Sequence, residues 1–257
     1  MGPILAVHVG NSRMKWGLHG PRGWLTQGVV PNADIGTLSL RDWQNLPRPT
    51  RAVGVNVAGE AARVRVEGQL ARWRLPVEWM SAQPEAAGVV NRHVPPAQLG
   101  PERWASLVAV RRRALAGELF APPCVVINAG TVVTIDALDA DGVFRGGLIL
   151  PGLRLMLRAM GDATAALKIP AGRCQAFPTT TADALASGVL QAVCGAVEQM
   201  RAQLKREDVA TQCYLAGGAA HEIAPHLTGP LEVVDNLVLE GVLVLALAGG
   251  PKSSFAA

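Results

Sequence analysis

The chain has 257 residues, 49% of them hydrophobic, and a formal net charge of +4 with a pI of about 9.2. This length and composition can bury a sizeable core, as one large domain or two modest ones. The sequence has no run of 18 apolar residues and no basic leader with a cleavage site, so we expect a cytoplasmic protein. Its charge suits an anionic ligand, but it is too mild and scattered to indicate nucleic-acid binding.

The four cysteines are Cys124, Cys174, Cys194 and Cys213. They form no CxxC pair, and no histidine stands near them at zinc-ligand spacing. We therefore expect buried, reduced thiols.

A strand, a small-residue turn and a second strand are predicted at the start of the chain. The apolar residues 4–9 end at Gly10-Asn11-Ser12, and a strand-like pattern resumes over residues 14–18. The arrangement recurs with residues 124–127, a turn at 128–131 and residues 132–138, followed by a further strand at 143–150. Chance can produce such a repeat in a glycine-rich chain, but it suggests an internally duplicated α/β fold.

Helical patterns occupy the intervening segments, at residues 61–73, 103–115, 153–167 and 181–204. Pro122-Pro123 would interrupt a helix, so we expect an N-terminal lobe over residues 1–120 and a C-terminal lobe over residues 121–257. The apolar segment 236–248 predicts a buried helix that ends at Gly249-Gly250, followed by a loose tail at 251–257.

Each glycine turn can bring backbone N–H groups and a hydroxyl close to a phosphate. Taken alone, either turn is better explained as an ordinary hairpin. Two such turns facing one another across a cleft would hold a nucleoside triphosphate, and we expect Gly10 and Gly130 to converge in this way.

Six short segments resemble, in the same order, the motifs of the type III pantothenate kinases, also called the Bvg accessory factor family. They are LAVHVGNSRMKWGL, LGPERWASLVAV, INAGTVVTIDAL, GGLILPGLRLMLRAM, TTTADALASG, and YLAGGAA with LVLEGV. The resemblance runs from residue 4 to about residue 245. It implies the duplicated two-lobe α/β fold of the actin-like ATPases, which acetate kinase, sugar kinases, heat-shock chaperones and actin share.

The resemblance also implies an activity, namely ATP-dependent phosphorylation of pantothenate, the first step of coenzyme A biosynthesis. It implies Mg²⁺ with the ATP, a monovalent cation such as K⁺ or NH₄⁺, and a homodimer. By position, the implied ATP-binding residues are His8, Val9, Gly10, Asn11, Ser12, Arg13, Met14, Lys15 and Thr131. The implied substrate-binding residues are His93, Gly100, Pro101, Glu102, Arg103 and Thr181, with Glu102 as the catalytic base and Asn128 as the cation ligand.

Glu102 replaces the aspartate of the family motif. The carboxylate is kept, but the side chain is one methylene longer, and a displacement of about 1 Å can cost ~100-fold in rate. Pro101 and Glu102 also suit the first turn of a helix for purely structural reasons.

His8 also replaces a family aspartate. An imidazole is a poor magnesium ligand, so His8 either donates a hydrogen bond to phosphate or is a structural residue at the end of a strand.

Three other implied positions have open interpretations. Asn128 keeps a carbonyl oxygen but lacks the charge that favours a cation, and His93 stands where the family commonly has tyrosine. Thr180 and Asp183 have the spacing of a helix cap, which would leave Thr181 available for substrate.

The changes at His8, His93, Glu102 and Asn128 leave two alternatives to an active pantothenate kinase. One is an impaired relative that acts as a nucleotide-binding or regulatory protein. The other is a kinase of the same fold with a different hydroxyl acceptor, which the change at His93 would favour.

Overall fold

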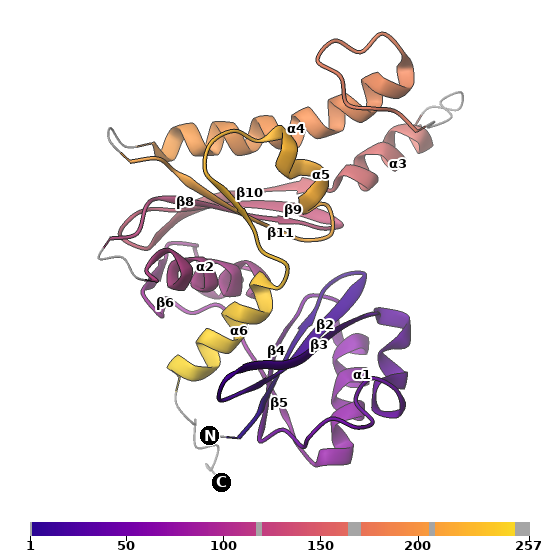
Figure 1. The fold of residues 1–257 in the computed structure, drawn as a ribbon, viewed down its shortest axis with the longest axis vertical. Helices are drawn as coiled ribbons and strands as arrows, with labels where there is room; N and C mark the ends of the chain where they lie inside the picture. The colour runs from indigo at the N-terminus through magenta and orange to yellow at the C-terminus, as the bar shows by residue number, and fades with distance from the viewer. Residues whose placement is uncertain (1, 117–119, 164–170, 206–208, 250–257) are drawn as a thin grey trace. The chain divides into compact units, whose positions relative to one another are not determined.

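The computed structural model describes residues 2–116, 120–163, 171–205 and 209–249 and divides the chain into two units (Figure 1). Unit 1 holds the described residues of Met1–Ala116 and Asn236–Ala257, and unit 2 those of Gly117–Asp235. The C-terminal segment, which we assigned to the second lobe from sequence, therefore groups with unit 1. The parts of our predictions that concern residues 164–167 and 250–257 lie outside the described residues.

Unit 1 contains a five-stranded sheet in the order β3-β2-β1-β4-β5. Its first three strands form an antiparallel meander, whereas β4 and β5 continue the sheet in parallel with β1. The strands are β1 Ile4–Val9, β2 Arg13–Gly20, β3 Gly23–Pro31, β4 Arg51–Asn56 and β5 Val77–Trp79. Nearly continuous burial along β1 and β4 shows that helices cover both faces of this sheet.

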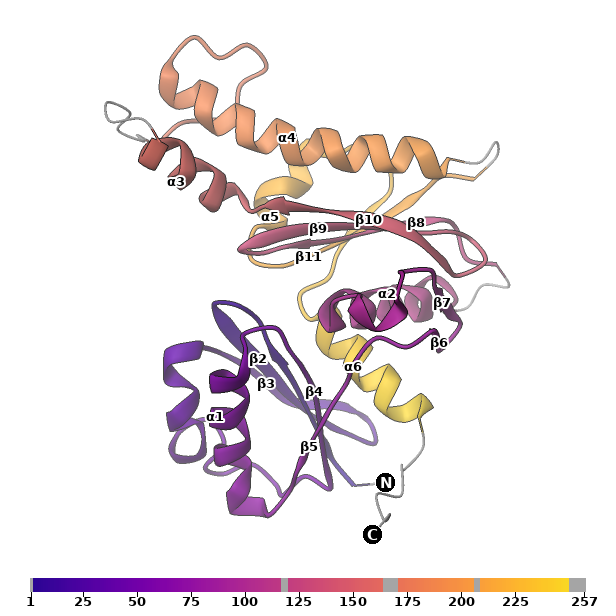
Figure 2. The same cartoon turned by 180° about the vertical axis from the view of Figure 1, so that it is seen from behind.

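One face packs against α1 Glu60–Leu70 in a core that includes Leu5, Val7 and Trp43. The opposite face packs against α2 Pro101–Ala114 and α6 Leu237–Ala248, as Figure 2 shows from behind. The nearly all-apolar sequence of α6 explains why the C-terminal segment joins unit 1, because this helix buries its surface against β1, β4 and α2.

Short elements complete unit 1. They are a hairpin of β6 Glu85–Ala86 and β7 Val89–Asn91, and the 3-10 helices η1 Asn32–Leu40, η2 Ala71–Trp73 and η3 Pro96–Gln98.

The strands of unit 2 follow the same plan, in the order β12-β11-β8-β9-β10. Strands β8, β9 and β10 form an antiparallel meander, and β11 and β12 run parallel to β8. The strands are β8 Cys124–Ala129, β9 Val132–Leu138, β10 Val143–Pro151, β11 Gln212–Ala216 and β12 Leu231–Val233. The shared topology confirms the internal duplication expected from the two strand-turn-strand patterns.

Unit 2 also contains α3 Leu153–Ala163, α4 Thr181–Leu204, the short α5 Ala220–Ile223 and the 3-10 helix η4 Ala224–His226. The predicted apolar face of α4 lies in the core, with Val189, Val193 and Val197 buried. No helix in the described part of the chain is both long enough and apolar enough to span a membrane.

Candidate functional site

The first glycine turn joins β1 to β2 at the carboxyl end of β1. The Gly10 N–H donates to the Arg13 carbonyl oxygen at 3.1 Å, which closes the turn. Asn11, Ser12 and Arg13 are exposed, whereas Val9 and Met14 on either side are buried. The buried strands therefore hold a polar turn at the surface, where backbone and hydroxyl donors are accessible to an anion.

Asn32 anchors this turn, although no pattern in the sequence around it indicates this role. Its Nδ2 donates to the carbonyl oxygens of Gly10 at 2.8 Å and Asn11 at 3.1 Å. Its own N–H donates to the Ser12 carbonyl oxygen at 3.1 Å. Asn32 follows the end of β3, so one residue binds all three turn positions from the neighbouring strand.

Lys15 supplies a positive charge close to the turn. It pairs with His8 in the register between β2 and β1, which places the two residues side by side. The Lys15 Nζ donates to Asn236 Oδ1 at 3.3 Å, and Asn236 Nδ2 donates to Gln27 Oε1 at 3.0 Å. Asn236 immediately precedes α6, so the C-terminal segment helps to hold the lysine.

His8 and Glu102, which are 94 residues apart in sequence, are in direct contact. His8 Nε2 lies 3.0 Å from Glu102 Oε2, and the two side chains are 16% and 26% exposed. A carboxylate that accepts this hydrogen bond requires the imidazole to donate from Nε2. Two of the four positions at which the sequence departs from the family motifs thus form one pair.

Glu102 lies in the first turn of α2 because Gly100 caps this helix and Pro101 occupies its first position. An acidic side chain at a helix N-terminus is stabilised by the helix dipole. Arg103 follows and is 8% exposed, and the Ser106 hydroxyl donates to the Glu102 carbonyl oxygen at 2.9 Å. The carboxylate is thus presented from a well-packed helix.

His93 lies in the loop before α2. Its Nδ1–H donates to the Pro95 carbonyl oxygen at 3.1 Å, and its backbone N–H donates to Asn91 Oδ1 at 3.0 Å. Asn91 is 5% exposed and also donates to the carbonyl oxygens of Gln83 and Pro96. Asn91 thus organises the loop that carries His93.

The second glycine turn, in unit 2, joins β8 to β9. The Gly130 N–H donates to the Val132 carbonyl oxygen at 3.1 Å, and Thr131 is exposed. Gly152 packs directly behind the turn, since a β-carbon there would overlap the Gly130 carbonyl oxygen. Asn128 is half-buried at the end of β8, before the turn.

Thr181, the remaining predicted site residue, is the exposed first residue of α4. The Thr180 Oγ1 accepts the Asp183 N–H at 3.2 Å, which confirms that Thr180 is the helix cap. The Asp183 carboxylate accepts the Arg173 backbone N–H at 2.8 Å, and this hydrogen bond lowers the pKa of Asp183. Thr181 is thus left out of the cap, as predicted.

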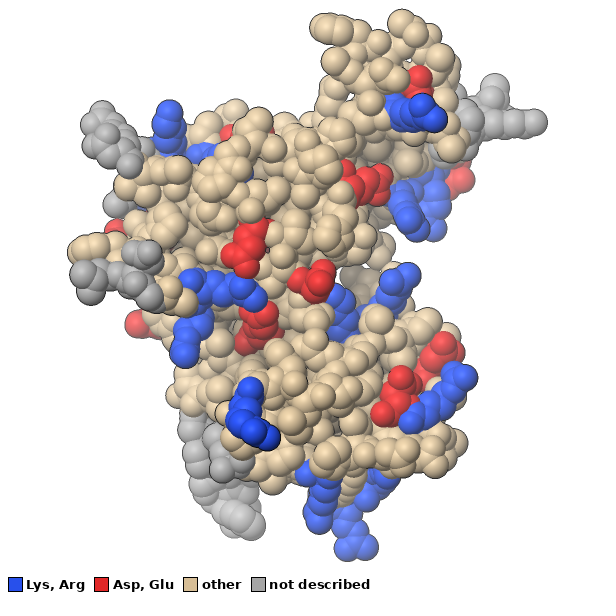
Figure 3. Space-filling model, in the orientation of Figure 1, with Lys and Arg blue, Asp and Glu red and all other residues tan. Residues whose placement is uncertain are grey.

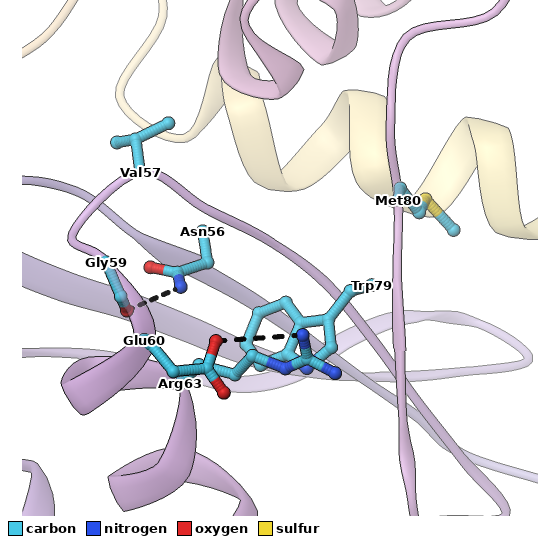
Figure 4. A pocket seen from close by; sticks show the side chains of 7 residues that line it. All are labelled: Asn56, Val57, Gly59, Glu60, Arg63, Trp79 and Met80. Atoms are coloured by element: carbon cyan, nitrogen blue, oxygen red, sulfur yellow. Dashed lines mark hydrogen bonds and ion pairs between the residues drawn. The ribbon is translucent and has the colours of Figure 1, made fainter. Parts of the chain in front are cut away.

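A hollow of about 420 Å³ lies in unit 1 at the carboxyl ends of β4 and β5 (Figure 4). It adjoins the first turn through the Val57 N–H, which donates to the Val9 carbonyl oxygen at 2.9 Å. Its lining residues are Asn56, Val57, Gly59, Glu60, Arg63, Trp79 and Met80.

Acidic and basic side chains are interspersed on the face shown in Figure 3, as the mild net charge suggests.

Possible metal ligands and the four thiols can be compared with the expectations from sequence. The described residues contain no group of three His, Cys, Asp or Glu side chains that could hold a metal ion. All four cysteines are free, and three are buried, but the expectation of burial is wrong for Cys174. Cys174 is exposed because it precedes α4 in a segment without regular secondary structure.

Comparisons with known proteins agree on one family. A family model described as type III pantothenate kinase matches residues 4–203. The type III pantothenate kinase of Leptothrix cholodnii is 45% identical over 252 residues, covering 95% of this chain and 96% of that protein. The type III pantothenate kinase of Acidovorax ebreus is 41% identical over 248 residues, covering 95% and 96%.

Solved structures of low sequence identity share the fold. A candidate Baf family transcriptional activator from Campylobacter jejuni has a TM-score of 0.62 at 18% identity, covering 95% of this chain and 98% of that one. A candidate 2-dehydro-3-deoxygalactonokinase from Sinorhizobium meliloti has a TM-score of 0.58 at 15% identity, covering 96% and 99%. These similarities confirm the duplicated α/β fold of the actin-like ATPases and sugar kinases.

Proposed function

The chain belongs to the type III pantothenate kinase family, and from that premise we propose that it transfers the γ-phosphoryl group of ATP to the primary hydroxyl of pantothenate. The product, phosphopantothenate, is the first intermediate of coenzyme A biosynthesis. The observation that carries this proposal is the position of Glu102, a carboxylate at a helix N-terminus, 3.0 Å from His8 at the end of the strand that leads into the first glycine turn. The proposed base and the proposed phosphate-binding turn therefore lie within one unit.

In this mechanism the hydroxyl oxygen of pantothenate attacks the γ-phosphorus of ATP, and Glu102 accepts the hydroxyl proton. The new phosphorus–oxygen bond forms while the bond to the bridging oxygen breaks, and ADP leaves. Glu102 stands in the first turn of α2, and the positive end of the helix dipole there suits a carboxylate.

The turn residues and Lys15 are the proposed phosphate donors of unit 1. Backbone N–H groups around Gly10 and the Ser12 hydroxyl donate to phosphate oxygens, and Lys15 supplies positive charge. Arg103, beside Glu102, is the proposed partner of the pantothenate carboxylate, and His93 and Gly100 complete this contact region. Thr131 and Thr181 are the nucleotide and substrate contacts proposed for unit 2.

The residues at the first turn do not fit a dedicated magnesium cage. Glu102 Oε2 is bound by His8, and Lys15 adds positive charge beside this pair. Mg²⁺ commonly binds through substrate phosphates and water, so we propose that it enters with ATP and assign no protein ligand to it. At Asn128 the neutral amide offers one carbonyl oxygen, so the binding of K⁺ or NH₄⁺ there would be weak. A homodimer and a cytoplasmic location remain parts of the proposal.

The test is a direct assay of the purified chain with ATP, Mg²⁺ and pantothenate, in which phosphorus NMR follows the formation of phosphopantothenate. We expect turnover that Glu102→Gln lowers by at least ~100-fold, because the amide cannot accept the proton. The matched control Glu222→Gln changes an exposed glutamate in α5 of unit 2 and should leave turnover unchanged. If the wild-type chain forms no phosphopantothenate, the proposed function is wrong.

A further inference from the structure

We propose that His8 is a positioning residue for Glu102. Its Nε2–H holds one carboxylate oxygen, Oε2, so that the other oxygen, Oε1, is presented to the acceptor hydroxyl. This inference rests on the proposed function and assigns His8 a role in the same reaction, other than binding phosphate or metal. The evidence is the 3.0 Å contact between side chains from two different elements, β1 and α2.

His8 is suited to this role because the neighbouring strands fix its backbone on both sides. His8 pairs with Lys15 of β2 and with Val55 of β4, so it lies in an interior strand of the sheet. Its side chain is only 16% exposed. A hydrogen bond with a charged partner in a partly desolvated place is stronger than one in open solvent. His8 thus provides a rigid donor at a fixed distance from the helix.

Glu102 needs such a donor because a glutamate has one more rotatable bond than an aspartate. An unrestrained carboxylate would sample several positions at the start of α2, and few of them would meet the acceptor hydroxyl. A misplacement of about 1 Å can cost ~100-fold in rate. By holding Oε2, the imidazole restricts the carboxylate to one position and offsets the extra methylene.

The pair of His8 and Glu102 also borders the first glycine turn within the same unit. A β-carbon built on Gly10 would lie 3.5 Å from His8 Nε2. The hydrogen bond between His8 and Glu102 therefore lies next to the backbone of the first glycine turn. This proximity joins the proposed base to the proposed phosphate donors.

In the reaction, the hydroxyl proton moves to Glu102 Oε1 as the oxygen–phosphorus bond forms and ADP departs. The His8 proton stays on Nε2 throughout. Histidine therefore contributes alignment rather than proton transfer, and a neutral donor of similar reach should replace it.

Steady-state kinetics of His8→Gln and His8→Ala test this role. We expect His8→Ala to lower kcat by ~10- to 100-fold while KM for pantothenate changes less than about threefold, because alignment acts on the transition state. We expect His8→Gln to keep kcat within about fivefold of wild type, because its amide N–H can still donate. His221→Gln, at an exposed histidine in unit 2, is the matched control and should change neither parameter.

His8→Asp provides the opposite test. It removes the imidazole donor and puts a second negative charge near Glu102, and like charges repel each other. We expect this variant to be less active than His8→Ala. An increase in activity for His8→Asp, an unchanged kcat for His8→Ala, or equal losses for the alanine and glutamine variants would each overturn the proposal.

A second readout does not depend on turnover. Long-range proton–nitrogen NMR correlations show which ring nitrogen of a histidine is protonated, and the chain has five histidines to assign. We expect His8 to be protonated at Nε2 in the wild type and to become a mixture of tautomers in Glu102→Ala. An unchanged His8 spectrum in Glu102→Ala would refute the contact, whether or not the chain phosphorylates pantothenate. Thermal unfolding of each variant separates loss of fold from loss of alignment.

Discussion

Gly241, in the middle of α6, lies so close to Ala105 of α2 that a β-carbon at residue 241 would overlap the Ala105 carbonyl oxygen. The two helices approach backbone to backbone at this point, which only a residue without a side chain permits. A bidentate ion pair between Arg113 and Glu240 binds the same helices, with both nitrogen–oxygen distances at 2.7 Å. Helix α6 thus supports the helix that carries Glu102.

We expect Gly241→Ala to destabilise unit 1. The added methyl group would push α6 away from α2, and overpacking of this kind costs roughly 1–3 kcal/mol of unfolding free energy. Because α2 carries Glu102, kcat should fall together with the thermal midpoint. Differential scanning calorimetry and the phosphorylation assay measure the two effects.

The matched control is Gly68→Ala, which changes an exposed glycine inside α1 of the same unit. No atom lies within 4 Å of a β-carbon at this position. Alanine is favoured over glycine in a helix by roughly 0.5–1 kcal/mol, so this variant should unfold at a slightly higher temperature. Equal effects of the two substitutions would contradict the close helix contact.

Asn32 should determine how well the first glycine turn holds the nucleotide. Asn32→Ala removes the donors to the carbonyl oxygens of Gly10 and Asn11, and we expect KM for ATP to rise by ~10-fold, equivalent to about 1.4 kcal/mol. Asn32→Asp should be worse, because its carboxylate faces those oxygens and would repel phosphate. The exposed Asn45, changed in the same two ways, is the control. A change in KM for pantothenate alone would contradict a role at the phosphate turn.

Gly152 should support the second glycine turn in unit 2, as Asn32 supports the first turn in unit 1. Gly152→Ala would displace the backbone of Gly130 and Thr131. It would also strain the hydrogen bond that the Gly152 N–H donates to the Thr131 carbonyl oxygen at 3.0 Å. We expect KM for ATP to rise at least ~10-fold, with a loss of stability of roughly 1–3 kcal/mol. The control is Gly195→Ala, at an exposed site in α4 where a β-carbon meets no atom. An unchanged KM for ATP would argue against nucleotide binding at this turn.

Strongly patterned elements of the fold were predictable from sequence, and short parallel strands were not. The predicted bounds of β1, β9 and α4 match the structure, because each has a clear apolar period and is bounded by turn or capping residues. Strands β5 and β12 have three residues each, which is too short for any period. The apolar pattern of α6 predicted burial but did not reveal which sheet would cover it.

The resemblance named candidate site residues, which stay predictions, but it did not reveal the contacts between them. His8 and Glu102 were each identified as departures from a motif, but a contact across 94 residues depends on how α2 packs against β1. Asn32 was missed because a single asparagine after a strand has no distinctive local pattern. Its role follows from the three-dimensional position of the turn that it anchors.

The cysteines should differ sharply in reactivity. Burial raises the pKa of the Cys194 thiol to about 11, whereas Cys174 is exposed. At pH 8 about one Cys194 side chain in a thousand would be the reactive thiolate. We expect iodoacetamide to modify Cys174 first, as measured by peptide mass spectrometry, and Cys174→Ser to remove this early labelling. Equal labelling of Cys194 at pH 8 would contradict its burial.

The ion pair between Arg51 and Glu78 should make part of the stability of unit 1 depend on pH. Arg51 Nε and Nη2 donate to the two Glu78 oxygens at 2.9 and 2.8 Å, and Arg51 Nη1 donates to the Ala246 carbonyl oxygen of α6 at 3.0 Å. The hydrogen bond from Arg51 lowers the pKa of Glu78, and partial burial opposes this effect. The pair therefore links the edge of the sheet to the end of α6 while Glu78 is ionised.

Because the folded pKa of Glu78 is depressed, its contribution is fully present above the unfolded value of about 4.3 and is lost as the pH falls through the folded pKa. We expect Glu78→Gln to be less stable than wild type at pH 7 by at most about 1 kcal/mol, since solvent screens a partly exposed pair. The difference should shrink towards zero near pH 3 in urea titrations followed by tryptophan fluorescence. The exposed Glu222→Gln variant should show no such difference at either pH. If the difference in unfolding free energy between Glu78→Gln and wild type stays constant from pH 7 to pH 3, packing rather than charge accounts for the role of Glu78.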